Sequence, residues 1–316
     1  MNARAISIAL RSLCAAALLA LLMFGVDWHA LGAHFASLRW APAFLAMLGL
    51  AAHFLVSPWK WQQSLRMHHL EFDLPYLIRA NGTGFFLNNF LPSAIGGDAY
   101  RIFRTLPADG QKLRAVSAVV VERLVGVSAL MALGAIGALY MIDSPLARTY
   151  LALLICGCIV AGAFLFAVRA GWITRAIDRF RHHKVVEAIR YNFDYLLHGG
   201  KRWPSLIAIS LLFQAIAIAI IYFVFQSLGV PASIPACMLI CAVSGLASIL
   251  PISINGIGVV EGSFAGTAVA LGLPYDTALA VALVIRLLAL LPSLIFGALY
   301  VLRGDAPVGR ATAASA

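Results

Sequence analysis

The sequence predicts an all-α polytopic membrane protein with about six transmembrane helices plus two re-entrant helical hairpins in an inverted-topology repeat. Hydrophobic residues make up 62% of the 316 residues and charged residues only 11%, whereas a soluble domain carries about a quarter charged residues. Apolar blocks of about 20 residues, enough to cross a bilayer as a helix, recur along the chain. We expect one integral-membrane domain over residues 1–316, with no separate soluble domain.

Most apolar blocks fit a full span, and two stretches do not. We expect an uncleaved first span that follows Arg4 and Arg11 and runs to about Val26. Further spans are expected at about 41–58, 114–141, 148–168, 204–228 and 277–302. Proline, glycine, asparagine and acidic residues interrupt the stretches 80–100 and about 234–272. Because proline removes a helical hydrogen bond, Pro92 and Pro251 predict that each stretch turns back within the bilayer. We expect the two tips to lie close together near the bilayer centre.

The basic residues orient the chain in the membrane. A net charge of +10 suits a nucleic-acid partner, but no zinc-ligand spacing or basic recognition helix lies outside the apolar blocks, so we expect no nucleic acid, metal or cofactor. Lys and Arg concentrate in cytoplasmic loops of membrane proteins. If each interrupted stretch enters and leaves on one side, Arg39 and Arg148 are the basic loop residues left outside. We therefore expect a bacterial-type inner-membrane protein with both termini cytoplasmic.

The predicted order of elements is the same in both halves of the chain. Residues about 1–142 form span, span, cytoplasmic hairpin and span, and residues about 148–303 form the same series with an external hairpin. The halves start on opposite sides of the membrane, which defines an inverted-topology repeat. The tetrapeptide Gly-Ala-Leu-Tyr ends the last span of each half, at 137–140 and 297–300.

Two arginines lie deep inside predicted spans. Arg123 and Arg286 each lie about nine residues into a span, roughly 14 Å deep at 1.5 Å per residue. An arginine near the bilayer centre costs at least about 2.5–3.5 kcal/mol, so it faces the protein interior and has a partner. One interpretation is that Asp98, Glu122 or Glu261 holds these arginines to pin helices together. The other is that the arginines bind a substrate.

Glycine-rich turns in the two hairpins are the second candidate element of a site. Gly96-Gly97-Asp98 and Asn255-Gly256-Ile257-Gly258 open helical segments whose N-termini would attract anions. Alternatively, Asp98 and Asn255 are N-cap residues and the glycines permit tight turns. Together with the arginines, these turns predict a deep cavity for a phosphate-type headgroup. The predicted substrate-binding residues are Arg101, Arg123, Arg286, Asp98, Glu122, Glu261, Asn89, Gly96, Gly97, Asn255, Gly256 and Gly258.

Four runs of sequence resemble a known family. They are NNFLPSAIGGDAYR at 88–101, VVVERLVGV at 119–127, LPISINGIGVVEGSF at 250–264 and VALVIRLLALLP at 281–292. This combination is similar to the lysylphosphatidylglycerol synthase transmembrane-region family, which includes the flippase half of multiple peptide resistance factor and stand-alone flippase-like proteins. The resemblance implies lipid translocation, with Asp98, Arg101, Glu122, Arg123, Glu261 and Arg286 at the matching polar positions.

The resemblance has one departure that bears on activity. The soluble aminoacyl-transferase domain of the bifunctional members is absent from this sequence, so synthesis of lysylphosphatidylglycerol is not expected. We expect a non-enzymatic flippase for an anionic or phosphate-linked lipid, driven passively or by ions, with Asp98, Glu122 and Glu261 as candidate proton carriers. The alternatives are an integral-membrane transferase or hydrolase acting on a lipid-linked substrate, and a membrane scaffold that transports nothing.

The predicted topology can be tested by cysteine labelling in intact cells, on a background without the native cysteines. We expect single cysteines near Arg39, Arg148 and Gly229 to react with a membrane-impermeant reagent from outside. A cysteine in the loop at about 181–202, or at either terminus, should react only after the cells are opened. Labelling of position 190 from outside would contradict the inverted repeat.

Overall fold

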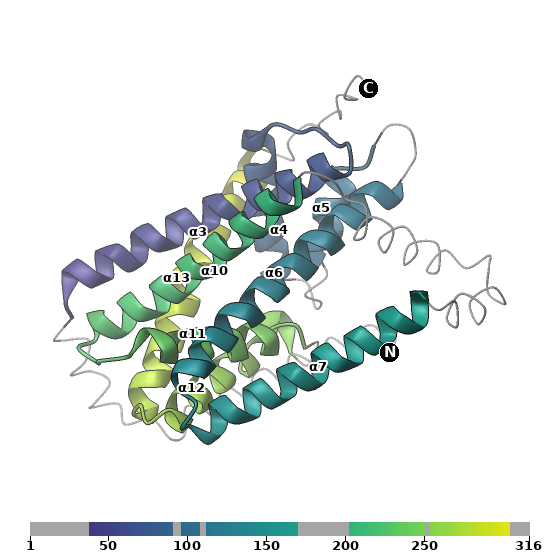
Figure 1. Cartoon of the computed structure of the whole chain (residues 1–316). Coiled ribbons are helices and arrows are strands. Elements are labelled where there is room, and N and C mark those ends of the chain that lie inside the picture. The colour runs from purple at the N-terminus through teal and green to yellow at the C-terminus, as the bar shows by residue number, and fades with distance from the viewer. Residues whose placement is uncertain (1–37, 91–95, 108–111, 170–201, 251–252, 304–316) are drawn as a thin grey trace, which may run out of the picture.

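The computed structural model describes residues 38–90, 96–107, 112–169, 202–250 and 253–303, and the regular elements in these ranges are helices (Figure 1). The predicted first span and residues 181–201 of the predicted loop lie outside the described residues. The helices are α3 (Trp40–Met67), α4 (Leu74–Phe90), α5 (Gly96–Arg104), α6 (Lys112–Tyr140), α7 (Pro145–Arg169), α10 (Trp203–Ser227), α11 (Ile234–Ala247), η2 (Ile254–Gly256), α12 (Val259–Ala270) and α13 (Tyr275–Arg303).

Five of the described helices are long and apolar enough to cross a membrane: α3, α6, α7, α10 and α13. They contain 25 to 29 residues, which at 1.5 Å per residue gives about 40 Å, more than the roughly 30 Å hydrocarbon core. The all-helical, multi-pass membrane architecture predicted from hydropathy is therefore confirmed for the described residues.

One predicted boundary is wrong. The span expected to end at residue 58 continues to Met67, and Pro58 lies inside α3. A proline removes one hydrogen bond from a helix but need not end it when the surrounding helices hold the chain. As a result, Lys60 and Trp61 are side chains of a membrane helix and are buried.

The two interrupted stretches each form a pair of shorter helices. The first consists of α4 and α5, and the second of α11 and α12 with the short η2 before α12. The helices of each pair pack against each other, and α4 also contacts η2. In Figure 1, α4 and α5 lie toward one end of the long helices, and α11 and α12 toward the other. Pro92 and Pro251 lie between the described segments.

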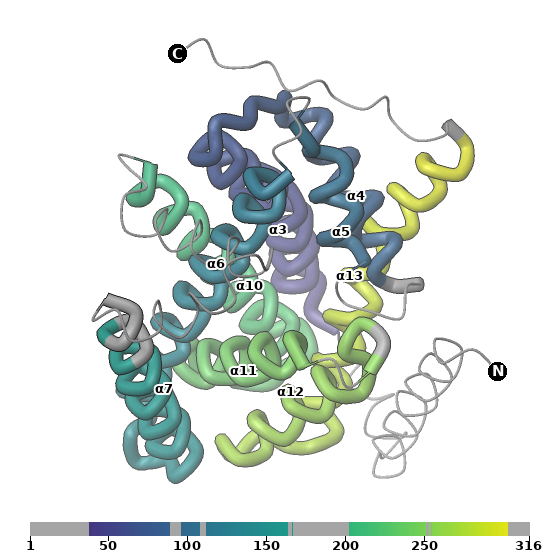
Figure 2. Tube along the Cα trace, turned by 90° about the vertical axis from the view of Figure 1, so that its right-hand side faces the viewer, coloured from purple at the N-terminus to yellow at the C-terminus, as the bar shows by residue number. Residues whose placement is uncertain are grey.

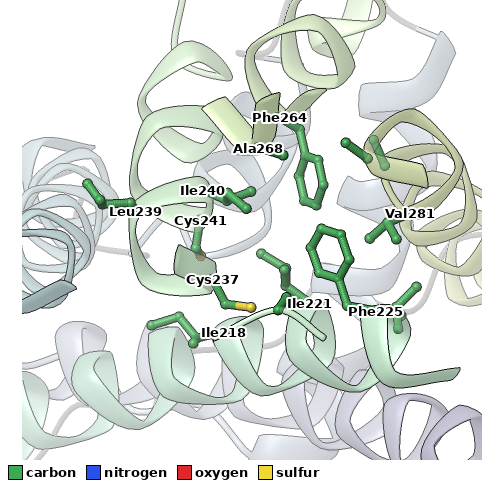
Figure 3. Close-up of a cluster of buried hydrophobic side chains, with 14 of the residues drawn as sticks. Ile218, Ile221, Phe225, Cys237, Leu239, Ile240, Cys241, Phe264, Ala268 and Val281 are labelled. Atoms are coloured by element: carbon green, nitrogen blue, oxygen red, sulfur yellow. The ribbon is translucent and has the colours of Figure 1, made fainter. Parts of the chain in front are cut away.

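The main hydrophobic core joins the second pair to the long helices. Figure 3 shows Phe225 of α10 facing Phe264 of α12, and their ring centroids are 6.0 Å apart. Cys237 and Cys241 of α11 are buried beside them as free thiols. These cysteines pack as small apolar side chains. In contrast, α7 contacts α6 near its own start, diverges from it beyond that point (Figure 1 and Figure 2) and leaves most of its apolar side chains exposed.

Glycines allow close approach between α4 and α13. The ring of Phe296 lies over Gly82, and the ring of Phe86 lies over Gly297. A Cβ atom at either glycine would overlap the opposing ring. Each helix therefore supplies one glycine and receives one ring, which is the small-residue packing common between membrane helices.

The α6–α11 contact also depends on glycine, and this dependence is testable. A Cβ atom at Gly137 would lie 2.7 Å from Met238 Cβ, and one at Gly134 would overlap Ala242 and Tyr150. We expect Gly134→Leu to lower the unfolding temperature of the purified protein in detergent, because overpacking costs about 1–3 kcal/mol.

Gly157→Leu is the matched control, because no atom of another described helix lies within 4 Å of a Cβ atom built on Gly157 of α7. A leucine at a helical glycine that faces open space should leave the unfolding temperature unchanged or raise it slightly. Equal destabilisation by both substitutions would mean that the α6–α11 approach does not limit stability.

Candidate functional site

Glu122 is the centre of a buried ion cluster formed by α3, α5 and α6. Its side chain is 3% exposed. Lys60 Nζ lies 2.8 Å from Oε1 and Arg101 Nη2 donates to Oε2 at 2.6 Å. Lys60 and Arg101 are each 4% exposed. A buried carboxylate is tolerated only with such partners, so Glu122 ties three helices together.

Asp98 extends this cluster to a second arginine. It lies in the first turn of α5, where a carboxylate complements the helix dipole. Arg101 Nη1 donates to its Oδ1 at 3.2 Å. Arg123 donates twice, from Nε to Oδ2 at 3.1 Å and from Nη2 to Oδ1 at 2.8 Å. These two hydrogen bonds form the bidentate arginine–carboxylate contact, which is stronger than a single hydrogen bond.

The ion cluster is defined here as Lys60, Asp98, Arg101, Glu122 and Arg123. Three cations face two carboxylates, which leaves one net positive charge. The Arg123 side chain is 53% exposed and is the accessible cation of the cluster. Two aromatic rings lie beneath the buried cations: Arg101 over Trp61 at 4.3 Å and Lys60 over Phe213 at 4.4 Å.

Lys60 is the functional candidate that the sequence analysis missed. The predicted span ends at residue 58, so Lys60 lies outside it. The signal that points to it is the carboxylate of Glu122, which cannot pair with the adjacent Arg123 and therefore needs a cation from another helix.

A second ion pair joins α12 to α13. Arg286 Nε donates to Glu261 Oε1, and Arg286 Nη1 donates to the carbonyl oxygen of Asn255 at 3.1 Å. The other oxygen of Glu261 accepts the backbone N–H of Gly258 at 2.7 Å. Glu261 therefore caps the start of α12 and neutralises Arg286 at the same time.

Positive backbone φ angles shape the turn into α12. They are 49° at Asn255, 69° at Gly256 and 82° at Gly258. Glycine adopts such angles without the steric cost of a Cβ atom, which explains both glycines. The N-cap position belongs to Gly258, and Asn255 contributes its backbone carbonyl to Arg286. The alternative interpretation of Asn255 as an N-cap is therefore wrong.

The two acid–arginine pairs are placed alike in the two halves of the chain. Asp98 and Arg123 are 25 residues apart, and so are Glu261 and Arg286. Each acid lies in the first turn of a short helix. Each arginine is the twelfth residue of a 29-residue helix, α6 or α13.

A cavity of about 250 Å³ lies between α3, α4, η2 and α13. Of the predicted site residues, Asn255 and Arg286 line the cavity. Four others belong to the ion cluster: Arg101, Arg123, Asp98 and Glu122.

The start of α5 is tied to the cavity through Asn88. Gly96 and Gly97 begin α5, and Gly97 donates its N–H to Asn88 Oδ1 at 2.6 Å. Asn88 also lines the cavity, whereas the side chain of Asn89 lies outside the described residues. The full lining is Leu50, His53, Phe54, Phe85, Asn88, Asn255, Arg286, Ala289, Leu290, Pro292 and Ser293.

The described part of the chain has no cluster of the side chains that most often bind metals. No group of three or more His, Cys, Asp or Glu side chains lies close enough there to hold an ion. The ion cluster and the Glu261–Arg286 pair instead place charged groups and hydrogen-bond donors within an apolar helical bundle.

Comparisons with known proteins agree with this architecture. A family model described as "Lysylphosphatidylglycerol synthase TM region" matches residues 5–297. The UPF0104 membrane protein MJ1078 of Methanocaldococcus jannaschii is 27% identical over 217 residues, which cover 68% of this chain and 92% of that protein.

The ion cluster predicts a ranking of stabilities. Glu122→Gln leaves Lys60 buried without a carboxylate partner and leaves Arg101 paired with Asp98 alone. Removing one partner of a buried ion pair lowers the free energy of unfolding by about 3–5 kcal/mol. Lys60→Met keeps the Arg101–Glu122 contact and should cost less. Thermal unfolding in detergent measures both, with Lys112→Met at the exposed start of α6 as the matched lysine control.

The double variant Lys60→Met, Glu122→Gln sharpens this measurement. It removes the stranded lysine, so it should be more stable than Glu122→Gln alone. If Glu122→Gln unfolds at the temperature of the unchanged protein, the cluster does not stabilise the bundle.

Proposed function

Because the chain belongs to the lysylphosphatidylglycerol synthase transmembrane-region family, we propose that it is a flippase that moves an anionic or phosphate-linked lipid across the inner membrane. The observation that carries the proposal is the pair of arginines inside the long apolar helices α6 and α13, each held by an acid of a short helix. Charge at such depth is costly, and in membrane proteins it commonly marks a substrate pathway.

We also propose that α4–α5 and α11–α12 are re-entrant hairpins of an inverted repeat. The equal separation of 25 residues in the two acid–arginine pairs supports this, as does the position of each arginine within its helix. The hairpins lie toward opposite ends of the long helices in Figure 1, as inverted halves require. In this arrangement both chain termini are cytoplasmic.

In the proposed mechanism the headgroup moves through the protein while the acyl or prenyl chains stay in lipid. The guanidinium groups of Arg123 and Arg286 bind phosphate oxygens, because a planar fork of N–H donors matches phosphate geometry. Rocking of one repeat against the other exposes the site first to one leaflet and then to the other. Asp98, Glu122 and Glu261 are the carboxylates available for ion coupling.

A lipid-linked transferase or hydrolase remains the main alternative, together with a scaffold that transports nothing. Both are outcomes of one experiment with purified protein in liposomes. Fluorescent phosphatidylglycerol in the outer leaflet should become protected from a membrane-impermeant quencher in the presence of the protein, and chromatography should recover it unaltered. Chemical conversion of the lipid would instead indicate an enzyme.

The arginines predict how transport responds to substitution. Arg286→Lys keeps the charge but loses the planar fork, so the transport rate should fall about tenfold or more, since hydrogen bonds to charged groups contribute about 1.5–3 kcal/mol. Arg123→Lys should have a similar effect. Arg148→Lys on the exposed side of α7 is the matched control and should transport normally.

Two outcomes would count against the arginine roles. If the Arg123 and Arg286 variants unfold as readily as they lose transport, these residues pin helices together. If both variants are stable and transport at the normal rate, they do not contact the headgroup. Absence of any lipid movement by the unchanged protein in liposomes of several anionic lipids would contradict the flippase proposal.

A further inference from the structure

Several polar side chains around the 250 Å³ cavity have hydrogen-bonding capacity that the described residues do not use. Arg286 Nε and Nη1 are bonded, but its buried Nη2 has no hydrogen-bond partner within the described ranges. A buried donor without a partner costs about 1–3 kcal/mol, and one beside a binding cavity indicates a group that a ligand would satisfy.

Asn88 presents a second donor to the cavity. Its Oδ1 accepts the N–H of Gly97 at 2.6 Å, which fixes the orientation of the amide. The amide Nδ2 is therefore the group left for a ligand, and it has no hydrogen bond to any residue that the structure describes. The first turn of α5 thus decides which end of the Asn88 amide is available.

His53 presents a third polar group from α3. Its ring stacks on Phe213 with 3.8 Å between centroids, which fixes the plane of the imidazole. Neither ring nitrogen hydrogen-bonds to a residue in the described segments, and the side chain lines the cavity. A neutral imidazole carries one N–H donor, so His53 adds a third hydrogen-bond donor to those of Arg286 and Asn88.

The character of these groups identifies the ligand chemistry. Donors from three different helices converge on one space, so the ligand must be rich in acceptors. The remaining lining is mostly apolar, with Leu50, Phe54, Phe85 and Leu290 among its members. An acceptor-rich group joined to an apolar body describes a phosphate ester of a membrane lipid.

We propose that this cavity is a headgroup pocket for a phosphate-bearing lipid, in which Asn88 and His53 select the headgroup and Arg286 anchors it. The proposal rests on the lipid-transport function above and names the site and the selecting residues. Glu261 already neutralises Arg286, so selection depends on the placement of donors more than on net charge. Because Asn88 also holds Gly97, an occupied pocket is linked directly to the α4–α5 pair.

Two substitutions remove the selecting donors while keeping the local packing. Asn88→Asp keeps an acceptor for the Gly97 N–H, removes the amide donor and adds a charge that repels phosphate. His53→Phe keeps the stacking on Phe213 and removes the ring nitrogens. Gln226→Glu, in the last turn of α10 and outside the cavity lining, is the matched control for an added carboxylate.

The readout is the rise in unfolding temperature of the full-length protein in detergent on addition of dihexanoyl phosphatidylglycerol, since a ligand of the folded state stabilises it. Dihexanoylglycerol, which lacks the phosphate, and sodium phosphate, which lacks the lipid, are the comparison probes. We expect the rise with the phospholipid alone. The apparent affinity should fall about tenfold or more in Asn88→Asp and about threefold in His53→Phe, and stay unchanged in Gln226→Glu.

Equal affinity of the unchanged protein and both pocket variants would overturn the proposal, provided that their unfolding temperatures without lipid are similar. A response to sodium phosphate equal to that with phospholipid would replace the lipid pocket by a site for free phosphate. The liposome assay separates this result from the function proposed above. If Asn88→Asp transports lipid at the normal rate, the headgroup-pocket proposal is wrong and the flippase proposal stands. If the protein binds the phospholipid selectively but transports none, the flippase proposal is wrong and the pocket proposal stands.

Discussion

The structure depends on neutralising charge inside an apolar helical bundle. An ionised side chain in hydrocarbon is tolerated only when another charge and the right hydrogen bonds meet it, so each such residue fixes the position of a second helix. Glu122 fixes α3 and α5 against α6 through Lys60 and Arg101. Arg286 fixes α13 against the start of α12 through Glu261. Apolar packing fills the space between these contacts but is less directional.

Much of the fold followed from the sequence, because hydropathy and helix-breaking residues act locally. The apolar blocks predicted α6, α7, α10 and α13 to within a few residues, and the interrupted stretches predicted the helix pairs α4–α5 and α11–α12. The end of α3 was wrong because a proline breaks a helix only when its neighbours allow it, and that depends on tertiary packing at Pro58.

The sequence predicted most of the charged residues of the candidate site but not how they pair. The sequence singled out Asp98, Glu122, Arg123, Glu261 and Arg286, because charge in an apolar block is visible without a structure. Which carboxylate meets which cation depends on the rotation of each helix about its axis, and this left the pairing open. Lys60, His53 and the orientation of the Asn88 amide depend on the same rotations, and only the folded chain shows them.

The reciprocal seating of Phe296 over Gly82 and of Phe86 over Gly297 limits how the two halves of the chain can move. Sliding α4 along α13 would move each ring off its glycine and into steric clash with the neighbouring residues of the opposing helix. A small tilt about the line that joins the two seats keeps both rings in place. In a tilt of this kind the seam would act as the pivot, and the displacement would grow with distance from it. In Figure 2, α7 lies on the side of the bundle away from α4 and α13, so such a tilt would displace it more than the helices beside the seam.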